Sequence, residues 1–141
     1  MRPRVFLDTN VFIFSFETPE SNSRKVISLL NEGKIEGVVS ERVLKEVIAY
    51  FRKYHSRDLA FLFREYLLEA CSPVMRDTVL EKMKSLKGKI KEKDLEQLAT
   101  VKALGLKFLV SLDRDFEEFE EYLTPKRFIQ LQGMKPSETD F

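Results

Sequence analysis

Short apolar runs alternate with longer amphipathic segments along this chain, and this alternation restricts the fold more than any other feature of the sequence. Runs of strand length lie at residues 4–8, 36–39 and 107–110, and helical periodicity fills much of the chain between them. Single strands that alternate with helices are typical of βαβ units, whose strands pair in parallel. We therefore expect an α/β fold with a central, mainly parallel β-sheet flanked by α-helices.

Capping residues and glycines predict where the helices begin and end. Ser40 precedes a segment of helical periodicity and is a good N-cap. A Ser or Asn can cap the helix that begins near Ser21, and a further helix follows Ser56. Gly33 and Gly105 follow such segments and favour helix ends. We also expect helices at residues 77–87 and 92–104, a short acidic helix after residue 112, a connection or strand at residues 71–75 and a last strand at residues 128–131.

The length of 141 residues is most simply that of one domain. We assign residues 1–132 to this domain and residues 133–141 to a polar, loose C-terminal tail. The single cysteine, Cys71, excludes an internal disulfide and favours the reducing cytoplasm. No apolar run approaches the ~20 residues of a membrane span, and the N-terminus lacks the pattern of a secretory signal, so we expect no membrane partner.

An aspartate interrupts the most apolar part of the sequence, VFLDTNVFIF at residues 5–14. Burying a carboxylate alone costs several kcal/mol or forces it to take up a proton. Asp8 therefore needs a hydrogen-bond donor, a cation, or a position where the strand leaves the core. Asp113 follows another apolar strand, and in an open parallel sheet both residues would lie at the carboxyl edge, where ligands gather.

Two further acids share helical stripes with apolar residues. Glu46 lies between Val43 and Val47 when residues are stepped at 100°, and Asp94 lies on the stripe of Leu98 in the same way. Each could be an edge position with the acid turned outward, and Asp94 could be a first-turn acid favoured by the helix dipole. Together with the strand-end acids, they instead indicate one cluster of carboxylates.

A cluster of acids requires a compensating cation, because the carboxylates would otherwise raise one another's pKa values. The chain has one His, His55, and one Cys, which nearly excludes a zinc site of nitrogen and sulfur ligands. Oxygen ligands suit Mg²⁺ or Mn²⁺, which bridge naturally to phosphate. An aspartyl-phosphate hydrolase with Asp8 as nucleophile is a weaker alternative, because Asn10 stands where a second aspartate is usual.

The net charge of +1 gives no overall attraction to nucleic acid, but the charges are unevenly distributed. Residues 82–93 contain six lysines, whereas residues 113–121 are mainly acidic. A basic segment beside an acidic one fits a polyanion substrate near a cation site. Two solvated helix faces of opposite sign would explain the same pattern.

The order of these motifs resembles the PIN-domain family. The resemblance is carried by DTN at residues 8–10 after a hydrophobic strand, SERVLKE at 40–46, a helix that opens with Asp94 and continues LATVKALG at 98–105, and SLDRDF at 111–116. It extends from residue 4 to about residue 131. Members of the family are small metal-dependent nucleases, and many are the toxins of VapBC toxin–antitoxin pairs.

The resemblance implies a role for each matched residue. Asp8, Glu46, Asp94 and Asp113 match the acids that hold one or two Mg²⁺ or Mn²⁺ ions and activate water for hydrolysis of RNA phosphodiesters. Asp115 matches a further acid of many members, and Thr9, Asn10 and Ser111 match polar residues that orient the carboxylates or a bound water. The resemblance also implies a homodimer, for which helices at residues 21–31 and 57–69 could supply an apolar surface.

Two expectations go beyond these matched positions. The lysines of the basic segment could contact the RNA backbone, and the candidates are Lys87, Lys89, Lys91 and Lys93. An antitoxin protein, if there is one, would cover the acidic cleft and could place an Arg among the carboxylates. The alternative to an enzyme is a PIN fold that binds RNA or protein without catalysis.

Overall fold

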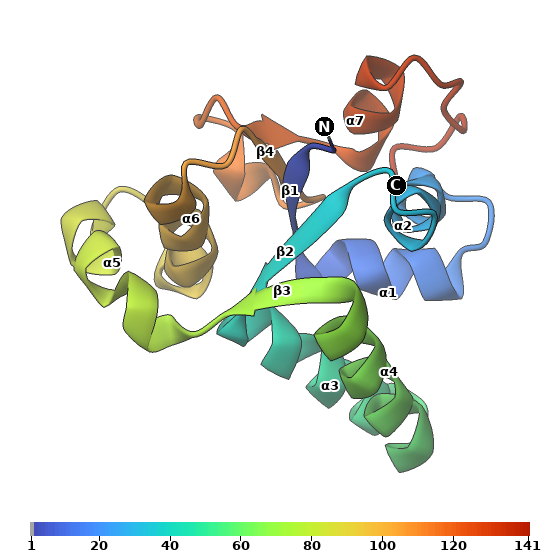
Figure 1. Ribbon diagram of the computed structural model, residues 1–141, viewed down its shortest axis with the longest axis horizontal. Helices are drawn as coiled ribbons and strands as arrows, with labels where there is room; N and C mark the ends of the chain where they lie inside the picture. The colour runs from blue at the N-terminus through green and yellow to red at the C-terminus, as the bar shows by residue number, and fades with distance from the viewer. Residues whose placement is uncertain (1) are drawn as a thin grey trace.

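Five parallel strands form the central sheet, in the order β3-β2-β1-β4-β5 (Figure 1). The computed structural model describes residues 2–141. The strands are β1 Arg4–Leu7, β2 Glu36–Ser40, β3 Cys71–Val74, β4 Phe108–Val110 and β5 Tyr122–Leu123. The predicted α/β fold is confirmed, and the sheet is wholly parallel over the residues described. β3 lies at the edge of the sheet, which is where a strand containing a proline, Pro73, is tolerated.

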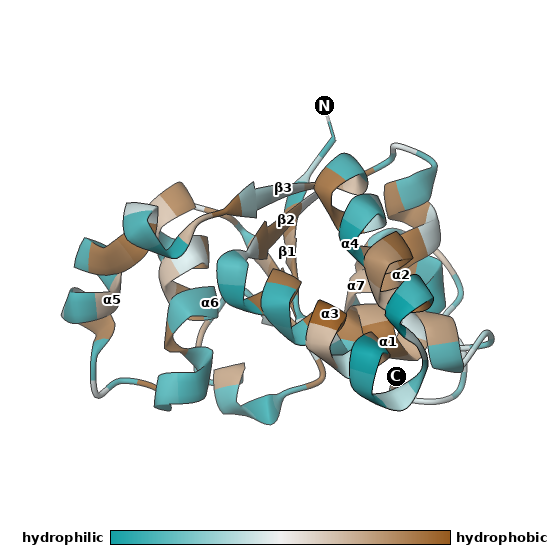
Figure 2. Cartoon of the chain, turned by 90° about the horizontal axis from the view of Figure 1, so that it is seen from below, coloured by the Kyte–Doolittle hydropathy of each residue, from teal (hydrophilic) through white to brown (hydrophobic). Residues whose placement is uncertain are grey.

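Helices cover both sides of this sheet. Figure 1 shows α5 and α6 on one side and α1, α2 and α7 on the other. The central strands are mainly hydrophobic, whereas the surrounding helices carry both hydrophobic and hydrophilic residues (Figure 2). Within residues 2–141, no helix has both the length and the apolar character that a membrane span requires. The helices are α1 Thr9–Glu17, α2 Asn22–Asn31, α3 Glu41–Tyr54, α4 Arg57–Ala70, α5 Leu80–Leu86, α6 Glu92–Leu104 and α7 Pro125–Leu131, with 3₁₀ turns η1 Arg76–Val79 and η2 Arg114–Phe116.

The predicted helix ends are confirmed where local signals specify them. The hydroxyls of Ser21, Ser40 and Ser56 each accept a hydrogen bond from a backbone N–H in the first turn of α2, α3 and α4. Gly105 ends α6 with φ +63°, a left-handed conformation that L side chains rarely adopt. These caps fix the start of α3 and the length of α6, the two helices that carry Glu46 and Asp94.

The structure corrects the prediction for residues 128–131, which belong to helix α7 and not to a strand. Thr124 caps this helix through its hydroxyl, and Pro125 occupies its first turn, where the missing N–H costs nothing. A segment of four residues, three of them apolar, does not distinguish a buried strand from a buried helix. The last strand is instead β5, Tyr122–Leu123, which lies just before α7.

The C-terminal residues pack against the domain, so the expectation of a loose tail is wrong. The side chain of Asn22, at the start of α2, donates to the carbonyl of Thr139 at 2.7 Å and accepts from the amide of Ser137 at 2.7 Å. The ring of Phe141 stacks on Phe14 with centroids 4.8 Å apart. These contacts hold the end of the chain against α1 and α2. The division of the chain after residue 132 stays a prediction.

The apolar residues of α2 and α4 lie partly in the core and partly at the surface. Val26 on α2 and Leu67 on α4 are buried, whereas Leu62 on α4 is 60% exposed. Between α1, α2 and α4 lies a groove of about 450 Å³ that is mainly apolar and includes Phe16 and Phe63. A homodimer built on this surface stays a prediction.

Candidate functional site

The strand order places the ends of β1 and β4 beside each other at the carboxyl edge of the sheet. β1 pairs with β2 along one edge and with β4 along its other edge. The strand order therefore reverses between β1 and β4. Open α/β sheets bind ligands at such a point. Asp8 follows β1 directly, and Ser111 and Asp113 follow β4. The fold therefore brings two of the predicted acids to the same edge.

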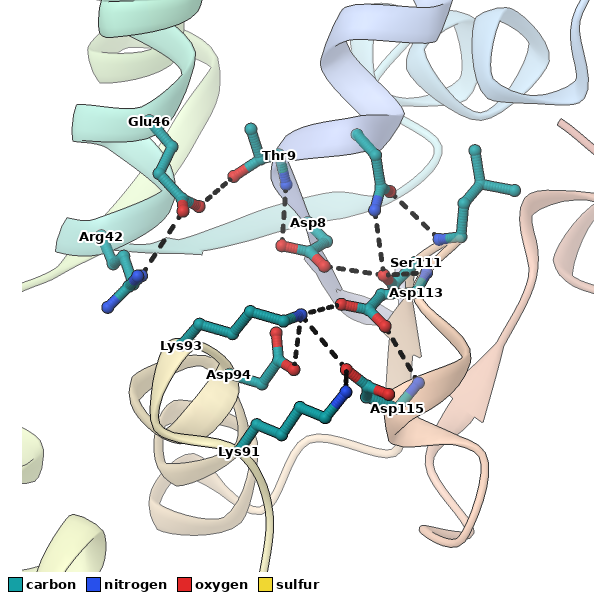
Figure 3. Close-up of polar contacts among 12 residues, drawn as sticks. Asp8, Thr9, Arg42, Glu46, Lys91, Lys93, Asp94, Ser111, Asp113 and Asp115 are labelled. Carbon is teal, nitrogen blue, oxygen red and sulfur yellow. Dashed lines mark hydrogen bonds and ion pairs between the residues drawn. The ribbon is translucent and has the colours of Figure 1, made fainter.

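The four acids singled out from the sequence line one pocket of about 360 Å³ (Figure 3). Asp8 and Asp113 come from the strand ends, Glu46 from α3 and Asp94 from the first turn of α6. The other pocket residues are Thr9, Asn10, Ile13, Tyr50, Lys93 and Gln97. His55 is not among them and pairs instead with Glu17, its Nε2 lying 2.9 Å from a Glu17 carboxylate oxygen.

Hydrogen bonds partly compensate the burial of Asp8. Its side chain is 4% exposed, and its oxygens accept from the backbone N–H of Thr9 at 2.8 Å and from the Ser111 hydroxyl at 2.7 Å. Burial nevertheless raises the pKa of Asp8 to about 6, and the charges of Glu46 and Asp94 add to the shift. The two hydrogen bonds therefore do not offset the cost of burying the Asp8 carboxylate, and a bound cation would offset it.

Ser111 joins the two strand ends through its hydroxyl. While donating to Asp8, the hydroxyl oxygen accepts from the amide of Asp113 at 2.9 Å and from the Asn10 side chain at 3.4 Å. The side-chain oxygen of Asn10 in turn accepts from the backbone N–H of Leu112 at 3.0 Å. These bonds fix Asp8 relative to Asp113, so Asn10 and Ser111 lie where they can orient the acids.

Glu46 is held toward the pocket by two neighbours. The Thr9 hydroxyl donates to one of its carboxylate oxygens at 2.8 Å, and Arg42, one turn earlier on α3, contacts the other at 3.4 Å. The bond from Thr9 links the start of α1 to α3. It therefore orients the Glu46 carboxylate toward Asp8 (Figure 3).

Asp94, Asp113 and Asp115 form the tightest group of carboxylates. One oxygen of each lies within 4.8 Å of the others, and the amide of Asp115 donates to Asp113 at 2.9 Å. Burial raises the pKa of Asp94, and the charge of Asp113 adds to the shift. The hydrogen bond from Lys93 lowers the pKa of Asp115. Asp8 and Glu46 lie outside this group but face the same pocket.

The four candidate lysines divide into two pairs. Lys93 donates to Asp94 at 2.9 Å and to Asp113 at 2.6 Å, and Lys91 pairs with Asp115 at 3.3 Å. Lys87 and Lys89 are exposed and form no ion pair with the residues described. The basic segment therefore lies beside the acidic one, but its last two lysines contact the carboxylates directly.

Sequence reasoning missed Gln97, which also lines the pocket. Its side chain is 2% exposed, and its carbonyl oxygen has no hydrogen-bond partner among the residues described. A buried acceptor without a partner costs free energy and points to an absent donor or cation. Gln97 follows Asp94 by three residues, so the helical spacing places both on the same face.

Glu96 was also missed, although it positions the two helices of the site. It is 3% exposed, accepts from the backbone N–H of Arg42 at 2.7 Å, and pairs with Arg76 at 3.3 Å. The first contact ties α6 to an otherwise unpaired N–H at the start of α3. Glu96 therefore fixes the helix of Asp94 against the helix of Glu46. Its partners are distant in the sequence, which left no local signal.

Replacing Glu96 with Gln should lower the free energy of unfolding by about 1–2 kcal/mol, because the amide retains an acceptor for Arg42 but loses the charge that pairs with Arg76. Urea unfolding of the variant and the wild-type protein measures this difference. The control is Glu81→Gln, since Glu81 is 91% exposed and should change stability little. Equal loss in both variants would contradict a positioning role for Glu96.

The donor set fits a hard divalent cation. Every pocket group that could act as a ligand offers oxygen, and the Asp94–Asp113–Asp115 oxygens are close enough for small side-chain movements to bring them to one ion. Burial raises the pKa values of Asp8 and Asp94, and Gln97 adds a buried oxygen without a hydrogen-bond partner among the residues described. The arrangement is suited to binding a metal ion at the edge of the sheet.

In sequence, residues 4–115 match the model of the PIN domain. A comparison with curated proteins returns no match.

Several solved structures share the fold at low sequence identity. A toxin–antitoxin complex from Klebsiella pneumoniae is 21% identical with a TM-score of 0.69, covering 86% of this chain and 97% of that one. DNA-bound VapBC from Salmonella typhimurium is 19% identical with a TM-score of 0.65, covering 89% and 99%. Mycobacterium tuberculosis VapC20, a sarcin-ricin loop cleaving toxin, is 15% identical with a TM-score of 0.60, covering 81% and 93%. Because the family match spans most of the sequence, this chain belongs to the PIN-domain family.

Proposed function

We propose that this protein is a metal-dependent ribonuclease that hydrolyses RNA phosphodiester bonds. The observation that carries the proposal is the convergence of Asp8, Glu46, Asp94 and Asp113, from four separate segments of a PIN domain, in one pocket. Carboxylates that are close together and partly uncompensated are costly for the fold, and a bound cation offsets that cost.

The carboxylates of Asp8, Glu46, Asp94 and Asp113 would hold one or two Mg²⁺ or Mn²⁺ ions. A divalent cation here would polarise the phosphate and lower the pKa of a water. Asp115 would support Asp113, to which its amide is bonded. The role of Thr9, Asn10 and Ser111 is to keep the acids oriented through the hydrogen bonds that join α1, α3 and β4.

RNA is the proposed substrate because one structural neighbour is described as a sarcin-ricin loop cleaving toxin. Lys87 and Lys89 are exposed near the pocket-lining start of α6 and could contact phosphates without reading sequence. We further infer action in the cytoplasm, where the free, buried thiol of Cys71 stays reduced.

The biological role we propose is that of the toxin in a toxin–antitoxin pair. Two neighbours were solved as toxin–antitoxin or VapBC complexes, which supports an antitoxin partner for this chain as well. Such a partner would inhibit the enzyme by covering the acidic pocket. A homodimer is part of the same proposal.

Incubation of the purified protein with end-labelled single-stranded RNA tests the proposed activity. We expect fragments when Mg²⁺ or Mn²⁺ is present, none with excess chelator, and recovery when the metal is restored. DNA of the same sequence is the control for substrate class. Cleavage that persists in chelator, or no cleavage with either metal, would overturn the proposal.

A PIN fold that binds RNA without cutting it is the second candidate, and the ion pairs of Lys93 favour it. An ammonium already neutralises part of the acidic group, so the fold does not require a metal. This candidate predicts that RNA binds while Mn²⁺ does not, which calorimetric titration of each ligand distinguishes.

A further inference from the structure

The ammonium of Lys93 lies among the three carboxylates that form the tightest acidic group. Its Nζ is 2.6 Å from Asp113, 2.9 Å from Asp94 and 3.2 Å from Asp115 (Figure 3). No other cation described in the chain contacts Asp94 or Asp113. One positive charge therefore occupies the place where three oxygen ligands converge.

This contact is electrostatically strong and still reversible. Lys93 donates hydrogen bonds to Asp113 and Asp94 and forms an ion pair with Asp115. The ammonium thus stays charged at neutral pH. The side chain is 50% exposed and lies in the first turn of α6, so it can leave the group by rotation of its flexible stem.

We propose that Lys93 is an internal counter-cation that competes with the divalent metal for Asp94 and Asp113. The inference rests on the proposed function, because it assumes that a metal binds this group. Metal loading then requires the ammonium to leave, and the affinity of the site is lower than the carboxylates alone would give. Lys91 stays paired with Asp115 at 3.3 Å, so this acid keeps one partner when Lys93 departs.

The competition gives Lys93 two effects of opposite sign. In the metal-free protein it stabilises the fold by offsetting repulsion among the acids, and toward metal it acts as an inhibitor. A lysine that only contacted the RNA backbone would weaken RNA binding when removed and leave metal affinity unchanged. Metal affinity measured without RNA therefore separates the two roles.

Calorimetric titration of Mn²⁺ into wild-type protein and Lys93→Met, without RNA, tests the competition. We expect the variant to bind Mn²⁺ roughly tenfold more tightly, a typical strength for coupling between two sites. In chelator its melting temperature should fall below that of the wild type, and saturating Mn²⁺ should raise it by more than it raises the wild type. Lys82→Met, which removes an exposed lysine from the same segment, should match the wild type in all three measurements.

A measurement on the wild-type protein keeps the test decisive if Lys93→Met does not fold. With lysine labelled at Nζ, the NMR signal of Lys93 should move on addition of Mg²⁺ toward the signals of exposed lysines. Mn²⁺ affinity that is unchanged or weaker in Lys93→Met, or a Lys93 signal that Mg²⁺ leaves in place, would overturn the competition while leaving the proposed nuclease intact. Failure of both proteins to bind Mn²⁺ at all would overturn the nuclease proposal and the competition together.

Discussion

Replacing Asp94 with Asn should reduce RNA cleavage by about 100- to 1,000-fold, the range found when one preorganised charge-stabilising group is removed from an active site. The amide has nearly the same size as the carboxylate, so the packing at the start of α6 should be retained. What is lost is the charge of a side chain that is 3% exposed and close to both Asp113 and Asp115. A divalent cation held by the remaining oxygens would bind more weakly and in a different position.

Single-turnover cleavage of labelled RNA at saturating Mn²⁺ measures this effect, and Mn²⁺ titration of the same variant should show weaker binding. Asp58→Asn is the matched control, because it makes the same chemical change at an exposed position on α4, outside the pocket. Both variants should keep the circular dichroism spectrum of the wild type. Full activity of Asp94→Asn would remove the catalytic interpretation of the acidic group.

The acids could be found from the sequence because each interrupts an apolar pattern whose geometry is simple. Asp8 and Asp113 follow strands, and parallel strands present their carboxyl ends at one edge. Glu46 and Asp94 share helical stripes with core residues, which the 100° step reveals. Local rules of this kind also predicted the cap at Ser40 and the helix that follows Ser56, since a helix start depends on a few neighbouring residues.

Features that depend on distant contacts could not be found in this way. Glu96 gains its role from Arg42, which lies 54 residues away in the sequence. The tail is held by Asn22, whose partners follow it by more than a hundred residues. The contact of Lys93 with Asp113 joins two segments that the sequence shows only as opposite charge runs. In each case the residues next to the side chain in the sequence give no sign of its role, because the fold alone brings its partner close.

The prediction of a strand at residues 128–131, which belong to α7, failed for a different reason. The segment at 128–131, with three apolar residues and Gln130, fits a buried strand and a buried helix equally well. Thr124 and Pro125 are a helix-start signal, and they carry the information that the apolar run lacks. Helix α1 was missed similarly, because only Asp8, Thr9 and Asn10 separate its apolar residues from those of β1.

Asp8→Asn should stabilise the metal-free protein by about 1–3 kcal/mol at neutral pH, although it removes a proposed ligand. Burial raises the pKa of Asp8 to about 6 in the folded protein, against 3.8 for an ordinary Asp, so the folded chain binds this proton more tightly than the unfolded chain. Stability of the wild type therefore falls as pH rises from about 4 to about 6 and stays lowered above that range. The amide does not ionise, and its oxygen can still accept from Thr9.

Urea unfolding in chelator, repeated from about pH 4 to about pH 8, measures this difference as a function of pH. The gain of Asp8→Asn over the wild type should be smallest near pH 4, grow through the window set by the two pKa values, and level off above it. Saturating Mn²⁺ should then reverse the order, because only the wild type keeps the charge that holds the metal. Asp58→Asn should not show the reversal with Mn²⁺, because it lies outside the pocket. A constant difference between Asp8→Asn and wild type across the range would mean that Asp8 ionises normally, since its hydrogen bonds to Thr9 and Ser111 would then fully offset its burial.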